Sequence, residues 1–369
     1  MEEIEAVFAG LEDPRSGNAK RHLLHEILVI GLCSVLCGGE TCADMALFGR
    51  SKEAFLREFL RLEAGIPSHD TFSRVFRLLD PARFHAWFLG FMRRFAEGYE
   101  GVVAIDGKTM RRSFDRASGT SALHLVSAWA ADQRLVLGQI AVNDKSNEIA
   151  AVPQLLALLG LKGRIVTADA MSCQREIARQ VVEQGGEYVL ALKGNQGTLQ
   201  DDVQRFLHDL ETPLASSSET DKGHGRIEIR TASLSTDIAW LQDSHDWPGL
   251  KAIGKICASR ELNAKLSHET RYYLLSTALS PEQFNAAVRA HWGIENGLHW
   301  TLDVVMNEDQ ARNRKDHGPE NLALLRKTAL NIAKLEPSTG SMRGKLKRAG
   351  WNNQFLAGML SQFAKIHMQ

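Results

Sequence analysis

The chain has 369 residues, of which 44% are apolar and 24% charged, and its formal net charge is zero. This composition is ordinary for a soluble globular protein with room for two or three domains. The neutral total gives no whole-chain signal for a nucleic-acid partner. The five cysteines are odd in number and lack paired spacing, which argues against a disulfide framework and against a zinc finger.

Residues 1–100 are predicted to form a helical domain. The stretch HLLHEILVIGLCSVLCGG predicts a buried helix that ends at Gly38 and Gly39. Its apolar part is too short to span a bilayer, and the acidic N-terminus does not resemble a signal peptide, so we expect a cytoplasmic protein. In GIPSHDTFSRVFRLLDP, Arg74 and Arg77 lie opposite the apolar helix face. This domain could contact DNA as a helix-turn-helix module, or it could serve packing or dimerisation.

From residue 101 the hydrophobic period changes to that of strands. Three consecutive strands are expected at Val102–Thr109, Leu123–Ala130 and Val136–Val142. Helices and strands then alternate, at Asn147–Leu159, Arg164–Thr167, Ser172–Gln184 and Tyr188–Leu192. This order is that of a ribonuclease-H-like sheet, in which the first strand is central and the fourth lies beside it.

Two aspartates occupy corresponding places in this topology. Asp106 lies in the first strand and Asp169 directly follows the fourth, so the two are expected to meet in space. A buried, unpaired Asp in an apolar strand costs several kcal/mol. Asp106 therefore needs a metal ion, a partner or an exposed strand end, and from the strand alone both a metal ligand and a turn cap remain open.

The rest of the chain is predicted to contain a β-rich insertion at about residues 196–275, and then a helical tail from Pro281 to about Lys334. Residues 101–335 would form the catalytic domain, and residues 336–369 a basic C-terminal tail whose first part, 336–350, is expected to be loose. Between Gln310 and Gly350 there are ten Lys or Arg against three acids. Such an excess suits either a phosphate-facing surface or a solvated helix face.

The helical tail offers a third carboxylate, Glu295, within HWGIENGLHWTLDV. Three acidic oxygen donors without Cys or His suit Mg²⁺ or Mn²⁺, and two such ions roughly 4 Å apart promote phosphodiester chemistry. Glu308 is the alternative third carboxylate, whereas Asp303 and Asp309 are interpreted as helix-face or capping acids. A zinc site is a weaker alternative, formed by three residues on one helix face: His291, Glu295 and His299.

Four motifs together carry a family resemblance: AIDGKTMRRS, VTADAM, ALKGNQ and HWGIENGLHWTLDV. In order and separation they resemble DDE insertion-sequence transposases of the H-repeat-associated group, and GIPSHDTFSRVFRLLDP is similar to that group's associated helical domain. The resemblance covers residues 5 to 335, and it implies an α/β protein with a ribonuclease-H-like catalytic domain, a β-rich insertion and a helical N-terminal domain. It also implies that Asp106, Asp169 and Glu295 are the catalytic and metal-binding residues.

One departure concerns phosphate contacts. The broader superfamily often carries a Tyr-Arg-Glu-Lys signature around the glutamate, but here Val288, His291 and Leu302 stand at the matching places. The phosphate-binding roles of that Arg and Lys therefore do not carry over, and His291, Arg289 or Lys193 are candidate replacements. The candidate DNA contacts are Arg74, Arg77, Lys108, Lys193, His224, Arg226, His291, Arg312 and Arg314.

The function expected from the sequence is a DNA transposase that cleaves the ends of an insertion sequence and transfers the freed 3′-hydroxyl to a target phosphodiester, with Mg²⁺ or Mn²⁺ as cofactor. The expected partners are terminal inverted repeats and target DNA, with no membrane, and the expected assembly is a dimer on DNA in the bacterial nucleoid. Two alternatives remain, a catalytically inactive DNA-binding protein derived from such an element and a stand-alone metal-dependent nuclease.

Overall fold

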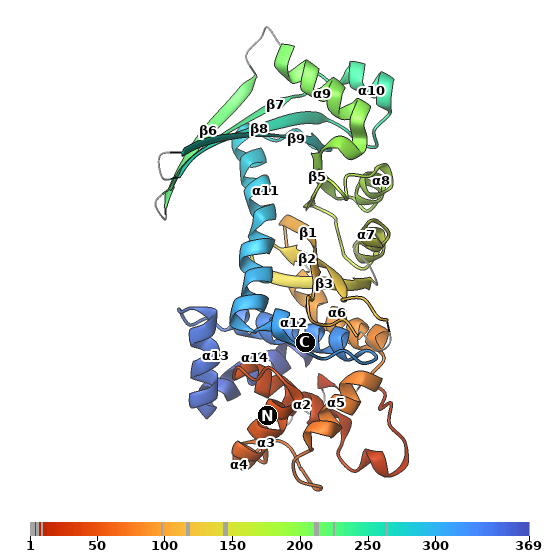
Figure 1. Cartoon of the computed structure of the whole chain (residues 1–369), viewed down its shortest axis with the longest axis vertical. Helices are drawn as coiled ribbons and strands as arrows, with labels where there is room; N and C mark the ends of the chain where they lie inside the picture. The colour runs from red at the N-terminus through yellow and green to blue at the C-terminus, as the bar shows by residue number, and fades with distance from the viewer. Residues whose placement is uncertain are drawn as a thin grey trace.

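The computed structural model describes residues 4, 7, 8, 10–96, 99–115, 119–142, 147–209, 214–223, 226–262 and 265–368. The molecule is elongated, with one large sheet in its upper part and a group of helices from both ends of the chain in its lower part (Figure 1). The sheet has nine strands in the order β3-β2-β1-β4-β5-β9-β8-β7-β6.

The first five strands have the predicted ribonuclease-H-like arrangement. They are β1 (Gly101–Thr109), β2 (His124–Ala130), β3 (Leu135–Val142), β4 (Arg164–Ala168) and β5 (Glu187–Leu192). β1 pairs antiparallel with β2 and parallel with β4, and Ile105 lies opposite Ala168. The residues after this last pair are Asp106 and Asp169, so the register alone brings the two aspartates to neighbouring positions of adjacent strands.

Helices α7 (Glu148–Ala157) and α8 (Arg175–Glu183) form the crossovers between β3, β4 and β5. The predicted helix start at Ser172 is wrong. The helix begins three residues later, after Gln174, which makes no side-chain cap. The backbone N–H of Ser172 instead donates to Oδ1 of Asp169 (3.2 Å), so this turn fixes the aspartate rather than the helix.

The insertion extends the same sheet instead of forming a separate layer. Its strands are β6 (Ala215–Gly223), β7 (Arg226–Ser235), β8 (Ala252–Leu262) and β9 (Lys265–Leu275), and β9 returns to pair antiparallel with β5. The insertion also contains two helices, α9 (Gly197–Asp209) and α10 (Ala239–His245), which the alternation of its strands did not predict. Helix α11 (Pro281–Ile294) runs beneath the curved extension and packs on β1, β4, β6 and β7 (Figure 1).

The predicted helical tail is interrupted after α11. Two π-helical stretches follow, η4 (Glu295–His299) and η5 (Thr301–Val305), which we call the π segment, residues 295–305. A short 3₁₀ turn, η6 (Glu308–Gln310), precedes α12 (Gly318–Leu335). π-helical turns are rare and often lie at functional sites.

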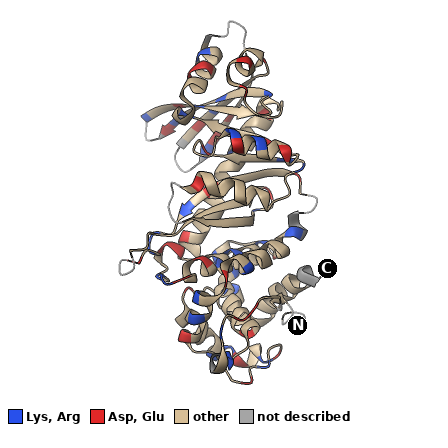
Figure 2. Ribbon diagram, turned by 90° about the vertical axis from the view of Figure 1, so that its right-hand side faces the viewer, with Lys and Arg blue, Asp and Glu red and all other residues tan. Residues whose placement is uncertain are grey.

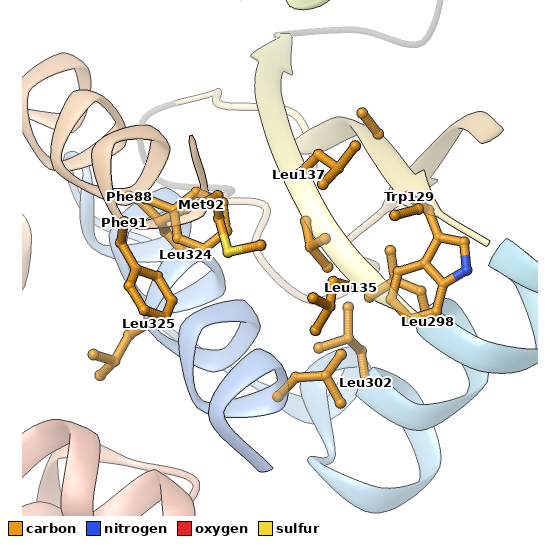
Figure 3. Close-up of a cluster of buried hydrophobic side chains, with 14 of the residues drawn as sticks. Phe88, Phe91, Met92, Trp129, Leu135, Leu137, Leu298, Leu302, Leu324 and Leu325 are labelled. Carbon is orange, nitrogen blue, oxygen red and sulfur yellow. The ribbon is translucent and has the colours of Figure 1, made fainter. Parts of the chain in front are cut away.

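Helices from both ends of the chain share one hydrophobic core with the sheet. The N-terminal elements are η1 (Gly17–Lys20), α2 (Leu24–Leu36), α3 (Cys42–Ser51), α4 (Glu53–Leu56), α5 (His69–Leu78) and α6 (Pro81–Ala96). Helix α12 contacts α2, α5, α6 and β3. Figure 3 shows Phe88, Phe91 and Met92 of α6 lying against Leu324 and Leu325 of α12, with Leu135 and Leu137 of β3 and Leu302 of the π segment nearby.

Two expectations for the basic region are corrected by this packing. Residues 336–350 are not loose throughout, because α13 (Met342–Trp351) forms there with Ser341 as its N-cap, and α14 (Asn353–Met368) follows. The positive charge is also only partly on the surface, since Arg326 and Lys327 are buried in α12. Within the described part of the chain, no helix has the length and apolar character that a membrane crossing needs.

Candidate active site

Asp106, Asp169 and Glu295 line one cleft of about 650 Å³, although they come from three distant parts of the chain. β1 supplies Asp106, the turn after β4 supplies Asp169, and the first residue of the π segment is Glu295. The remaining lining residues are Gly107, Lys108, Thr109, Arg111, His124, His299, Trp300, Asp303 and Asp309. The wall opposite the two strands is thus formed by one face of the π segment.

The carboxyl group of Asp106 is the most perturbed acid of the cleft. Its side chain is 20% exposed, and Oδ1 accepts a hydrogen bond from the backbone N–H of Gly107 (2.9 Å). Burial raises the pKa of Asp106 to about 7, and the carboxylates of Glu148, Asp169 and Glu295 add to the rise, while the Gly107 hydrogen bond opposes it. Three neighbouring carboxylates therefore place negative charge around that of Asp106.

Gly107 is required by the close approach of a buried His–Glu pair. A Cβ atom at this position would lie 2.4 Å from Nε2 of His124 and 2.7 Å from Oε1 of Glu148. These two side chains contact each other at 3.1 Å (Nε2 to Oε2), and Nδ1 of His124 lies 2.8 Å from Oγ1 of Thr109. Sequence reasoning missed Glu148, a fourth acid near Asp106, because a single Glu at a helix start carries no local signal.

The KGNQ motif holds the loop that follows Asp169. Nδ2 of Asn195 donates to the carbonyl oxygen of Ala170 (2.6 Å), and Nε2 of Gln196 donates to that of Cys173 (3.1 Å). Both side chains therefore tie the turn after β5 to the turn after β4. Lys193, the first residue of the motif, is exposed and lines a neighbouring pocket together with Asp169.

The two histidines of the zinc alternative have separate partners. Nδ1 of His291 lies 3.2 Å from Oγ1 of Thr167, while Nδ1 of His299 lies 3.5 Å from Oδ2 of Asp106. Burial lowers the pKa of His291 to about 4 and that of His299 to about 3, so both rings are neutral near pH 7. Because the helix changes to π geometry at Glu295, the three residues of that alternative no longer follow the spacing of one straight α-helix.

The donor set of the cleft fits a hard divalent cation. Among the described residues, no three His, Cys, Asp or Glu side chains are close enough to hold a metal ion by themselves. Mg²⁺ seldom needs such a cage, since it is usually held by one or two carboxylates together with waters and substrate phosphates. The carboxylates of Asp106, Asp169 and Glu295 supply oxygen donors only. The raised pKa of Asp106 reflects its burial and the repulsion from neighbouring carboxylates, and a bound cation would offset both.

A cluster of acids surrounds Lys108 at the side of the cleft. The ammonium nitrogen is 2.7 Å from Oδ1 of Asp303, 3.1 Å from Oε2 of Glu308 and 3.2 Å from Oδ1 of Asp309. Glu308, the alternative third carboxylate, is fully buried against this ammonium and does not line the cleft. Asp303 and Asp309 lie in the first turns of η5 and η6, and both also line the cleft.

The candidate DNA contacts fall in several places. Arg77, Arg312 and Arg314 meet with Lys315 in a second cleft of about 450 Å³ between α5 and the loop before α12, which we call the basic cleft. Arg74 is exposed on α5. Arg226 begins β7, with its side chain outside the description, and His224 lies outside the described residues. Arg289 is engaged by two acids of β6, Glu219 (3.2 Å) and Asp221 (3.4 Å).

Trp292 is half-buried and lines the neighbouring pocket that contains Asp169 and Lys193. The guanidinium of Arg271 lies over its ring at 4.6 Å, and the ring packs against a hydrophobic cluster formed by α11 and the insertion strands. This packing is the arrangement expected of a core side chain.

Comparison with known proteins gives consistent matches along the chain. Residues 98–332 match the family model described as "Transposase DDE domain", and residues 5–92 match "DDE_Tnp_1-associated". "H repeat-associated putative transposase YhhI" of Escherichia coli K12 is 39% identical over 350 residues, which is 92% of this chain and 93% of that protein. An uncharacterized protein of Xanthobacter autotrophicus is 45% identical over 279 residues, 74% of this chain and 94% of its own length.

Among solved structures, a piggyBac transposase in a synaptic complex with hairpin DNA aligns with all of this chain and 77% of its own, at 10% identity and a TM-score of 0.45.

Proposed function

We propose that this chain, which belongs to the DDE transposase family, cleaves the ends of an insertion sequence and joins them to target DNA at the cleft of Asp106, Asp169 and Glu295. The observation that carries the proposal is the convergence of these three carboxylates from β1, the turn after β4 and the π segment. Membership of the DDE transposase family supports DNA as the substrate, and the three carboxylates of the cleft are the groups that would promote phosphodiester cleavage there.

Asp106, Asp169 and Glu295 are the residues that would hold Mg²⁺ or Mn²⁺. Two such ions activate a water or a 3′-hydroxyl and stabilise the leaving oxygen during phosphodiester displacement. The protein's own contribution is positioning. Asp106 is fixed by the N–H of Gly107 and Asp169 by the N–H of Ser172, so both carboxylates are oriented before substrate arrives. The neutral ring of His299 fills the space beside Asp106 without adding a charge.

The basic cleft is the surface proposed to bind the DNA backbone next to the carboxylates. Arg312 and Lys315 are exposed there, and Arg77 pairs with Asp316 (2.7 Å). Arg314 packs on Phe114 at 4.8 Å and donates to the carbonyl oxygen of Arg112 (3.1 Å), so the segment after β1 connects the two clefts. Figure 2 shows Lys and Arg interspersed with Asp and Glu over the molecule. The gathering of four cations in the basic cleft therefore marks it as a candidate surface for DNA.

A dimer on DNA is part of the proposal. Joining both ends of an element to one target requires two ends held together, and each protomer has one such cleft.

The test is an Asp106→Asn substitution, with Asp201→Asn on the exposed surface of α9 as the matched control. We expect Asp106→Asn to lose cleavage of a terminal-repeat substrate in Mg²⁺ or Mn²⁺ by at least two orders of magnitude, and to retain end binding. The substitution removes a cation ligand but no surface that contacts the DNA backbone. Asp201→Asn should cleave normally.

Cleavage by Asp106→Asn at the wild-type rate would refute the assignment of this cleft. The same assay separates the alternatives, because cut but never joined ends indicate a stand-alone nuclease. Binding without any cleavage by the wild-type chain indicates an inactive DNA-binding derivative.

A further inference from the structure

We infer that Lys108 is a positioning residue rather than a phosphate contact, and that it holds the acidic stretch after Glu295 against β1 and so sets where Glu295 stands in the cleft. The inference rests on the proposed function, because the position of Glu295 matters to catalysis only if Glu295 acts there. It replaces the expectation that Lys108 meets DNA.

The surroundings of the Lys108 ammonium leave little room for a phosphate. The side chain is 9% exposed, and three carboxylates lie within 3.2 Å of Nζ. An ammonium has three N–H donors and no acceptor, so three carboxylate partners account for its capacity. A phosphate approaching Lys108 would meet these acids first.

The acids in turn depend on this ammonium. Glu308 is fully buried, and its other cation, Arg326, is 4.0 Å away. Asp309 has a second partner, the exposed Arg111 at 3.3 Å, whereas the 2.7 Å ion pair of Asp303 is with Lys108. Removing one member of a buried ion pair leaves an uncompensated charge, which is strongly unfavourable. The stretch from Asp303 to Asp309 would therefore move toward solvent if the ammonium were lost.

Lys108 and Asp106 contact the π segment at two different positions along its axis. They are two residues apart in β1 and so project from the same face of the strand. Asp106 contacts His299, and Lys108 contacts Asp303, four residues further along the π segment. Two contacts at different positions along a helical segment fix both its position along the axis and its rotation about the axis. Glu295 lies about one turn before His299, so these contacts also fix the position of Glu295.

The opposite face of the π segment is held by apolar packing. Leu298 and Leu302 are fully buried, and a Cβ added at Gly297 would lie 3.2 Å from the ring of Trp129 (Figure 3 labels Trp129 and both leucines). Apolar packing is not directional, so it allows small rotations that the ion pairs of Lys108 would prevent. Apolar packing on one face and ion pairs on the other together explain why the buried cation Lys108 lies two residues from the catalytic Asp106.

The experiment compares Lys108→Met, which keeps the apolar stem and removes the charge, with Lys315→Met in the basic cleft. Hydrogen exchange is measured by mass spectrometry on the full chain without DNA or metal. We expect Lys108→Met to increase the exchange rate of amides in residues 295–309 at least tenfold and to leave β5 and α2 unchanged. Binding of this variant to the DNA ends should keep the wild-type salt dependence. In the cleavage reaction its kcat should fall while its KM stays unchanged.

Lys315→Met should show the reverse pattern, with unchanged exchange in residues 295–309 and a weaker salt dependence of end binding. Unchanged exchange in Lys108→Met together with a weaker salt dependence would overturn the inference and restore Lys108 as a DNA contact.

Two further variants keep the inference testable if Lys108→Met folds poorly. Asp303→Asn removes the shortest ion pair and should also speed exchange in residues 295–309, whereas unaltered exchange would contradict the role of Lys108. Adding Glu308→Gln to Lys108→Met removes the uncompensated buried carboxylate and should restore part of the protection, and no recovery would argue against charge compensation. These readouts do not depend on cleavage, so they stand apart from the Asp106→Asn test.

Discussion

Asp106 is the residue at which function and stability oppose each other. It lies in a central strand between apolar neighbours, where an acid is costly. Burial, together with the charges of three further acids, raises its pKa to about 7. A cation would offset this cost. Strand periodicity located Asp106 and Asp169 because both depend on sheet register. It could not locate Glu148 or the partners of Lys108, because these contacts join residues far apart in the chain and no local pattern specifies them.

The cost of burying the Asp106 carboxylate predicts that Asp106→Asn is more stable than the wild type by an amount that depends on pH. The folded-state pKa is about 7 and the unfolded value is near 4. Between these values the folded state holds a proton that the unfolded state releases, so wild-type stability falls as pH rises from about 4 to 7 and is level above. Asparagine has no charge to bury. Asp106→Asn should therefore exceed the wild type at pH 8 by roughly 1–4 kcal/mol and match it near pH 4.

Urea unfolding with a metal chelator, repeated at several pH values, measures this difference. Asp201→Asn serves as the control and should differ little from the wild type at every pH. A stability gap for Asp106→Asn that did not change with pH would contradict the raised pKa assigned to this carboxyl group. Adding Mg²⁺ should narrow the gap, because an ion that binds only the folded wild type stabilises it.

At the scale of elements, the site depends on connections between turns that the sequence shows only as motifs. The KGNQ motif was recognisable, but its role was not, since Asn195 and Gln196 act on a loop more than twenty residues earlier. The π segment was likewise expected to be ordinary helix, because π geometry arises from tertiary packing and has no compositional signal. Residues 336–350 were expected to be loose because they are rich in Gly, Ser, Lys and Arg, yet the Ser341 cap and buried Leu346 and Ala349 stabilise α13.

The motif predicts that Asn195→Ala loosens the loop that carries Asp169. The substitution removes the 2.6 Å hydrogen bond to the carbonyl oxygen of Ala170. We expect a loss of about 1 kcal/mol in unfolding free energy, the usual worth of one such bond, and faster hydrogen exchange in residues 169–174. Gln354→Ala, on the exposed side of α14, should change neither quantity. Protection of residues 169–174 that remained at the wild-type level would show that the motif does not hold this loop.

At the scale of the whole molecule, periodicity predicts the order of the strands but not how the helices pack against the sheet. The ribonuclease-H-like strand order followed from periodicity and the handedness of crossovers, and it is confirmed. The proposed boundary near residue 100 does not separate two cores, because α2, α6 and α12 belong to one hydrophobic cluster with β1, β2 and β3. Burial of long-range partners cannot be read from local patterns, and for the same reason Arg326 and Lys327 were counted with the surface charges.

Net neutrality of the whole chain makes the basic cleft the decisive region for DNA binding, and salt dependence tests it. Each duplex phosphate that is neutralised adds about −0.9 to the slope of log affinity against log salt concentration. Arg312 is exposed in the basic cleft, so Arg312→Gln should reduce the magnitude of that slope by about 1 in an end-binding titration. Arg179→Gln, on the exposed face of α8, should keep the wild-type slope. Equal slopes for all three proteins would remove the basic cleft from the DNA path, and the backbone would then have to follow another surface to reach Asp106.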